Sequence, residues 1–196
     1  VGVMDLTLQN GVAPEDGMNP LFDAAGGGVH CSSNLEGTEL VANDMSMDNV
    51  MITGNSAQTG GGMFSLGCNL TISNSEIASN NGEFGAGFIS FEGNHSWTAV
   101  DIVDNESVGY SAGGFASGMF SPDTYTVMLD DVVVTGNVNL EGDEGGVLAF
   151  VGSTAATWTG TAGAEGSGVW GNTSPGSGSL ELIDGGQLVA DTVDFG

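Results

Sequence analysis

Carboxylates are almost the only charged groups that this chain can bring to chemistry. Its 196 residues include 25 Asp and Glu, two His, and no Lys or Arg. Asp130 and Asp131 form an adjacent pair, but adjacent side chains in a strand point to opposite faces. An inverting glycosidase needs two carboxylates about 6.5–9.5 Å apart across a cleft, and the nearest histidine in sequence, His95, lies 35 residues before Asp130. These residues predict that the chain is not an enzyme.

Metal binding has one weak candidate. Glu141, Asp143 and Glu144 lie in the densest acidic segment, LEGDEGG. A turn there would offer several oxygens to Ca²⁺, which takes about six to eight. His30 and His95 lack the spacing of a zinc site. We expect no required cofactor and, at most, weak Ca²⁺ binding.

The absence of Lys and Arg excludes several kinds of partner. Nucleic-acid binding needs these residues to displace the counterions of phosphates, and binding to anionic lipid needs a basic patch. The formal net charge is −25 at pH 7, although only 13% of the residues are charged. We therefore expect a polar surface with scattered carboxylates, which attracts cations and binds neither nucleic acid nor an anionic membrane.

Two short signatures alternate along the chain and indicate a repeat. The first is a Gly-rich start followed by apolar residues, as in GGGVHC (26–31), GGGMFSLGC (60–68), GAGFISF (85–91), GGFASGMF (113–120) and GGVLAFVG (145–152). The second is a β-branched or apolar run that ends in Asn. It places Asn10, Asn55, Asn80, Asn105, Asn137 and Asn172 at intervals of 45, 25, 25, 32 and 35 residues. Repeats of about 20–50 residues are typical of solenoids.

The repeating runs predict strands, because they are short, rich in Val, Ile, Thr, Leu and Phe, and bounded by Gly, Asn, Asp and Ser. We predict one all-β domain over residues 1–196. It is a single-stranded right-handed parallel β-helix of about six to eight coils, stacked about 4.8 Å apart. The residues expected to fill its core are Met45, Met47, Met51, Met63, Phe64, Phe88 and Phe91.

The six repeated asparagines are expected to form a structural ladder at equivalent turns. Asn tolerates the left-handed backbone conformation, and its amide can bond to neighbouring turns. Cys31 and Cys68 each follow a Gly triplet in successive repeats, 37 residues apart. We predict a disulfide between them, which would stabilise the fold by roughly 3–4 kcal/mol in the chain-entropy model.

With these motifs the sequence resembles right-handed parallel β-helix repeat proteins of bacterial surfaces, in particular polymorphic outer-membrane-protein repeats and autotransporter passengers. The resemblance rests on the GGG-apolar and TGN segments and covers nearly the whole chain. It implies a secreted or cell-surface location. The pectin-cleaving proteins with this fold use either an arginine base with Ca²⁺, or aspartates with neighbouring His, Arg and Lys, and this chain has no Arg or Lys.

Two functional interpretations follow. The first is a non-catalytic extracellular β-helix, structural or adhesive, whose acidic surface offers no Lys or Arg to trypsin-like proteases. The alternative is a carbohydrate-binding or carbohydrate-cleaving, pectin-lyase-like β-helix. A groove with clustered carboxylates and exposed aromatics would favour the alternative, and a flat Ser, Thr and Asn face would favour the first. The aromatic candidates are Trp97, Tyr110, Tyr125, Trp158 and Trp170.

The expected partners are copies of the same chain. The first residues, VGVMDLTL, and the last, LVADTVDFG, are strand-like and show no capping helix. We expect the chain either to belong to a longer β-helix or to self-associate, end to end or laterally, into a filament or surface layer. Four Asn-x-Ser/Thr sequons agree with secretion; they begin at Asn69, Asn94, Asn105 and Asn172.

Overall fold

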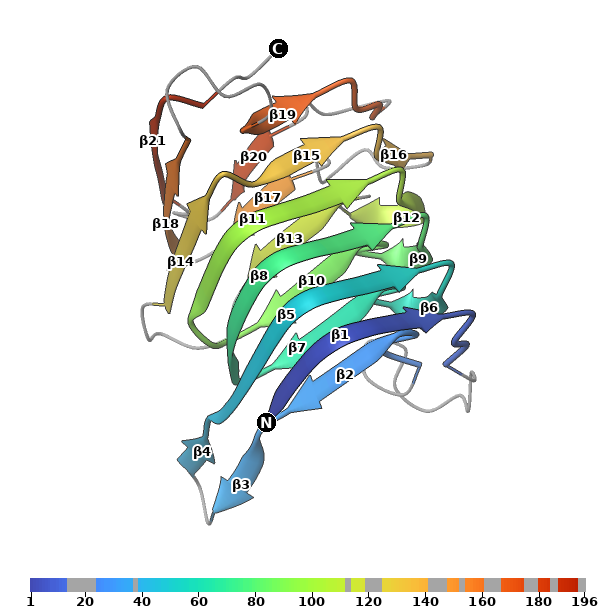
Figure 1. Ribbon diagram of the computed structural model, residues 1–196, viewed down its shortest axis with the longest axis vertical. Helices are drawn as coiled ribbons and strands as arrows, with labels where there is room; N and C mark the ends of the chain where they lie inside the picture. The colour runs from blue at the N-terminus through green and yellow to red at the C-terminus, as the bar shows by residue number, and fades with distance from the viewer. Residues whose placement is uncertain are drawn as a thin grey trace.

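The fold is all-β, as a computed structural model shows (Figure 1). It describes residues 1–13, 24–36, 39–111, 114–118, 125–140, 148–151, 154–160, 167–174, 180–183 and 187–193. These residues form β-strands and no helix. Three parallel sheets stack the strands of successive coils, and the first and last described strands, β1 and β21, lie at opposite ends of the nine-stranded sheet.

The three parallel sheets have nine, six and four strands. The nine-stranded sheet contains β1 (Gly2–Gln9), β5 (Asn43–Thr53), β8 (Cys68–Ala78), β11 (His95–Val103), β14 (Tyr125–Asp130), β15 (Val133–Thr135), β18 (Thr154–Thr159), β19 (Gly168–Trp170) and β21 (Gln187–Asp191). The six-stranded sheet contains β2 (Val29–Ser32), β7 (Met63–Leu66), β10 (Phe88–Phe91), β13 (Phe115–Gly118), β17 (Leu148–Val151) and β20 (Leu180–Ile183). The four-stranded sheet contains β6 (Ser56–Thr59), β9 (Asn81–Phe84), β12 (Glu106–Ser111) and β16 (Val138–Asn139).

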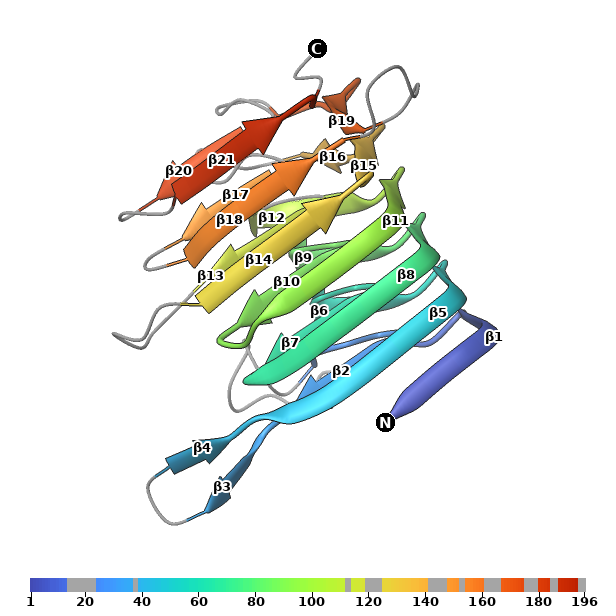
Figure 2. The same ribbon diagram turned by 60° about the vertical axis from the view of Figure 1, so that its left-hand side comes forward.

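The chain visits the sheets in a fixed order, which makes it a β-solenoid. β5, β6 and β7 lie in the nine-, four- and six-stranded sheets, and β8, β9 and β10 repeat that order one coil further on (Figure 2). About four turns have a strand in all three sheets. The prediction of a parallel β-solenoid is confirmed, whereas the right-handed sense and the count of six to eight coils stay predictions. β3 (Asn34–Glu36) and β4 (Glu39–Val41) form an antiparallel hairpin that extends away from the stack.

Stacked apolar side chains fill the interior of the coils. One column runs through Ile52, Ile77, Ile102, Val134 and Val169, which are register partners on neighbouring strands and at most 2% exposed. Like residues in contact on successive coils remove apolar surface from water at each step of the stack. The same interaction therefore stabilises every coil.

The expected core residues are only partly where we predicted them. Met47, Met63, Phe64 and Phe88 are buried. Phe64 belongs to a second cluster, because it lies on the face of β7 opposite to Met63. Met45 and Phe91 are half-buried. Met51 was predicted wrongly: its side chain is 40% exposed, because it lies on the outer face of β5, between the inward-facing Val50 and Ile52.

A bend divides the long strands of the nine-stranded sheet. Asn49, Asn74 and Ala99 occupy the equivalent position of β5, β8 and β11, with φ angles of 52°, 48° and 53°. Asp5 and Asp131 continue the column with φ angles of 54° and 51°. This left-handed conformation costs an ordinary residue about 1–2 kcal/mol, and Asn and Asp tolerate it best. Ala99 lacks a side chain suited to this conformation.

Replacing Ala99 with Asn is expected to stabilise the protein by about 1 kcal/mol, because Asn accepts the left-handed conformation that Ala resists. The matched control is Thr98→Asn, at the neighbouring exposed strand position, where no gain is expected. Chemical denaturation followed by circular dichroism measures both. Equal effects of the two substitutions would contradict this account of the bend.

Candidate functional sites: a buried asparagine ladder and a groove with carboxylates

Five of the predicted asparagines form a continuous hydrogen-bonded ladder. Asn80 shows the pattern: its Oδ1 accepts hydrogen bonds from the backbone N (2.9 Å) and Nδ2 (3.0 Å) of Asn55. Its Nδ2 donates to the carbonyl O of Ile52 and to Oδ1 of Asn105, both at 2.9 Å. The side-chain amide thus uses two acceptor and two donor positions inside the fold. The rungs are Asn55, Asn80, Asn105, Asn137 and Asn172.

Glycines of the Gly-rich signature leave room for the side chains of this ladder. A Cβ atom built on Gly62 would lie 2.8 Å from Nδ2 of Asn80 and 2.6 Å from the carbonyl O of Gly87. Real Cβ atoms do not approach other atoms so closely. Gly28 and Gly87 have the same relation to Asn55 and Asn105. The glycines of the first signature therefore pack directly against the asparagines of the second. The sequence alone did not reveal this contact.

Asn10 lies one position before the ladder, contrary to our expectation. Gln9 is the register partner of Thr53, so Asn10 lies opposite Gly54. The ladder position of the first coil belongs to Gly11, whose N–H donates to Oδ1 of Asn55 at 2.8 Å. A Cβ on Gly11 would collide with the carbonyl oxygen of Gly27, so no amide side chain fits there. Asn10 instead adopts a left-handed φ of 58°.

Several carboxylates accept hydrogen bonds from neutral side chains. In a chain without Lys or Arg, these bonds stabilise the ionised acids in place of ion pairs. Asp48 accepts hydrogen bonds from Ser73 Oγ (2.6 Å) and Asn74 Nδ2 (2.9 Å) on the next coil. These two bonds hold the pKa of Asp48 below its usual value. The other pairs are Asn49 to Asp5, Asn69 to Asp44, Thr159 to Asp130 and Gln58 to Glu83.

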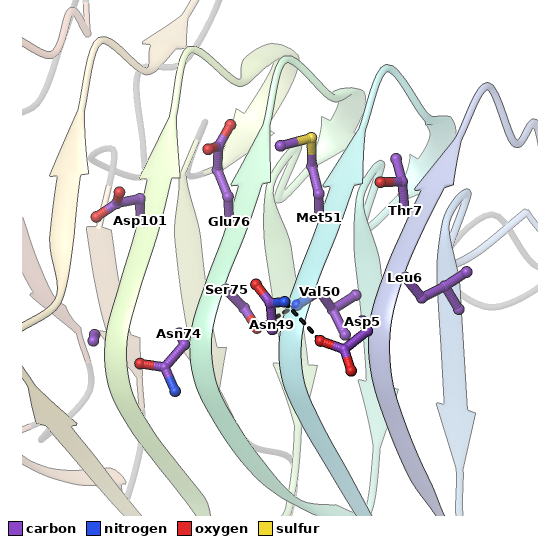
Figure 3. A pocket seen from close by; sticks show the side chains of 11 residues that line it. Asp5, Leu6, Thr7, Asn49, Val50, Met51, Asn74, Ser75, Glu76 and Asp101 are labelled. Atoms are coloured by element: carbon purple, nitrogen blue, oxygen red, sulfur yellow. Dashed lines mark hydrogen bonds between the residues drawn. The ribbon is translucent and has the colours of Figure 1, made fainter.

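A groove of about 410 Å³ lies on the outer face of the nine-stranded sheet, where the strands bend (Figure 3). Glu76 on β8 and Asp101 on β11 are register partners beside it, and they extend the row formed by Thr7 and Met51. Within the described residues neither carboxylate has a hydrogen-bonding partner. Partial burial raises the pKa of Asp101. Two unpaired carboxylates, one with a raised pKa, are thus neighbours in the groove.

The groove has the acids that sugar cleavage uses but not the aromatic side chains that sugar binding uses. A retaining glycosidase needs two carboxyl groups about 5–5.5 Å apart, and parallel strands place partners about 4.8 Å apart. However, the candidates Trp97 and Trp158 are fully buried in the core, so neither offers an exposed surface for a sugar ring. Tyr125 and Trp170 are half-buried and do not line the groove. The side chain of Tyr110 lies outside the described residues.

The predicted disulfide between Cys31 and Cys68 is confirmed. It links β2 to the first residue of β8, and so ties together two coils near the start of the chain. The weak Ca²⁺ candidates Glu141, Asp143 and Glu144 lie outside the described residues. In the part that the structure describes, no three His, Cys, Asp or Glu side chains are placed to hold a metal ion. Nor does that part contain a helix able to span a membrane.

His95 and Ser90 form a buried pair that the sequence did not suggest. His95 Nε2 lies 2.7 Å from Ser90 Oγ, and both residues are at most 1% exposed. A hydroxyl beside an imidazole resembles a nucleophile and its base, but no substrate can reach this pair. Burial lowers the pKa of His95 to about 3. The pair is a structural element of the core, with a neutral histidine.

No known protein family, curated protein or solved structure matches this chain.

Replacing Asn80 with Ala is expected to destabilise the protein by at least about 3 kcal/mol. The change removes the side-chain donor to the Ile52 carbonyl and the Oδ1 acceptor of both the backbone N–H and the Nδ2 of Asn55. Each buried group left unsatisfied costs about 1–3 kcal/mol. The control is Asn81→Ala, an exposed neighbour for which a change within about 0.5 kcal/mol is expected. Urea unfolding of both variants measures the difference. A similar loss in both would contradict the proposed importance of the ladder.

His95 is expected to make the protein less stable in acid. Its pKa is about 3 in the folded state against 6.5 ordinarily, so the unfolded chain binds a proton first as the pH falls. The stabilisation from neutral His95 is complete above pH 6.5 and is lost between pH 6.5 and 3, by up to roughly 4 kcal/mol.

The measurement compares the wild type with His95→Leu, because Leu70 holds the equivalent position one coil earlier. The carboxylates titrate in both proteins, so the difference between the two unfolding free energies isolates His95. That difference should shift in favour of the variant below pH 6.5. A difference that stays constant from pH 8 to pH 4 would refute the assignment.

Proposed function

We propose that this protein is a non-catalytic extracellular β-helix with a structural or adhesive role, at the cell surface or secreted. In this proposal the solenoid is right-handed and has six to eight coils, like the polymorphic outer-membrane-protein repeats and autotransporter passengers that its sequence resembles. The observation that carries the proposal is the five-rung asparagine ladder. Four of its five asparagines are buried, and their amides bond between coils instead of lining a site open to substrate.

The outer surface supports the same role. The disulfide fits an oxidising compartment, where such bonds persist. Neutral donors partner several of the described carboxylates without cancelling their charge. The chain has no Lys or Arg for trypsin-like proteases to cut. The exposed residues of β8 and β11 include Thr71 and Thr98, part of the polar face that the structural interpretation predicts. The product is a rigid, anionic and protease-resistant rod.

The proposed partners are other copies of the chain, associated end to end or laterally. A net charge of −25 opposes their approach, since each copy repels the next. Screening by salt shortens the range of this repulsion, and divalent cations can bridge carboxylates of two copies. Association should therefore depend on the ions present.

Salt and Ca²⁺ are expected to raise the thermal midpoint and to promote association, because both weaken repulsion between carboxylates that have no cationic partner. Light scattering and differential scanning calorimetry measure the two effects in dilute buffer, in high salt, and in Ca²⁺ with NaCl at matched ionic strength. A monodisperse monomer in all three conditions would refute self-assembly as the function.

A second candidate function rests on the Glu76–Asp101 pair. Neighbouring carboxylates, one with a raised pKa, are the groups that a retaining glycosidase uses. If the groove cleaves polysaccharides, release of reducing ends should be lost in Glu76→Gln and Asp101→Asn but kept in Asp130→Asn, which alters an exposed carboxylate outside the groove. No release by the wild type across neutral and acidic polysaccharides would eliminate this candidate and leave the structural role.

A further inference from the structure

The fold divides the four sequons into two structural groups. Asn69 and Asn94 lie on the outside of the coils, where Asn94 N and Nδ2 both donate to Asn69 Oδ1. Asn105 and Asn172 are rungs of the asparagine ladder, in which Asn105 is buried and Asn172 is half-buried. An N-linked glycan replaces one hydrogen of an asparagine amide and needs open space beside it. Asn94 from the first group and Asn105 from the second therefore differ in whether the folded chain can carry a sugar there.

Asn94 meets both requirements of a glycan acceptor, which are open space beside the amide and an amide hydrogen that the fold does not use. It is exposed and lies in the turn between β10 and β11, directly before His95. Its Oδ1 accepts bonds from Thr126 N (3.0 Å) and Oγ1 (2.9 Å), which fixes the plane of the amide. One amide hydrogen bonds Asn69 Oδ1 at 3.3 Å. The second makes no hydrogen bond within the described residues, so the fold does not need it.

Asn105 meets neither requirement. It is 0% exposed, and its Nδ2 donates one hydrogen to the carbonyl O of Ile77 and the other to Oδ1 of Asn137, both at 2.9 Å. A sugar on this nitrogen would remove one of these bonds. It would also have to occupy space beside Gly87, where a single added Cβ would already lie 3.0 Å from Nδ2. A glycan there and the folded ladder exclude each other.

We propose that Asn94 is an acceptor site for an N-linked oligosaccharide, and that the fold excludes a glycan from Asn105. In the transfer, Nδ2 of Asn94 attacks the anomeric carbon of a sugar carried on a diphosphate leaving group. The new bond joins Nδ2 to C1, and the bond from C1 to the diphosphate oxygen breaks. The diphosphate leaves with that electron pair, and Nδ2 loses one proton.

This division has a consequence for export of the chain. A transferase that acts on unfolded chains meets the Asn105 sequon before the ladder has formed. Chains modified at Asn105 cannot close the rungs to Ile77 and Asn137 and remain unfolded. Chains modified at Asn94 fold normally, because their sugar points away from the coils. Folding therefore selects which glycosylated forms leave the cell.

The test is to pass the full chain, behind a cleavable signal peptide, through a eukaryotic secretory pathway. Glycan release in ¹⁸O-labelled water followed by peptide mass spectrometry then measures the occupancy of each sequon in the secreted and the retained fractions. We expect Asn94 to be occupied in the secreted protein. We expect the occupancy of Asn105 to be at least ten-fold lower in the secreted than in the retained fraction.

Two matched variants separate modification from folding. Ser96→Ala removes the Asn94 sequon and should abolish the glycan at position 94 of the secreted protein without reducing its yield. Ser107→Ala removes the Asn105 sequon and should raise the secreted yield. Since Ser107 Oγ also donates to the Glu83 carbonyl at 2.9 Å, the thermal midpoint of bacterially produced Ser107→Ala measures the cost of losing that bond. Secreted, cooperatively folded protein with a glycan on Asn105, or without one on Asn94, would overturn the proposal.

Discussion

The buried side-chain amide of asparagine is the group on which the stacking of this solenoid depends. Each ladder residue both accepts and donates between neighbouring coils, as Asn80 does with Asn55 and Asn105. A buried amide that lost these partners would cost several kcal/mol, so the coils can stack in only one register. The glycines follow from this constraint, because a side chain at Gly62 would occupy the place of the Asn80 amide. The apolar columns then fill the space that the ladder defines.

Neutral hydrogen bonds take the place of ion pairs for several of the described carboxylates. Asp48 is held by a serine and an asparagine, and Asp130 by a threonine. Such pairs stabilise a carboxylate without cancelling its charge, so the molecule remains strongly anionic after folding. Glu76 and Asp101 lack such partners among the described residues and lie side by side in one groove. These two acids therefore depend on the solvent for a proton or a cation.

Sequence periodicity predicted the class of fold, the disulfide and most of the ladder, because these features repeat with the coil. It failed where the backbone departs from simple alternation. The left-handed residue Asn49 shifts Met51 to the outer face, and no hydrophobicity pattern records a φ angle. Asn10 precedes a ladder position occupied by Gly11, where no amide side chain fits. The groove was missed because it joins residues from different coils. The Ser90–His95 pair was missed because the turn between these two residues shows no motif.

Hydrogen exchange at individual backbone amides tests the central claim most directly. The N–H groups of Asn55, Asn80 and Asn105 each donate to the Oδ1 of the next ladder residue. If the ladder holds the coils in register, these amides should exchange only through global unfolding, with protection equal to the free energy of unfolding. The N–H groups of Asn94 and Thr126 form similar bonds to exposed asparagines and should exchange faster. Equal and rapid exchange of both sets would contradict the account.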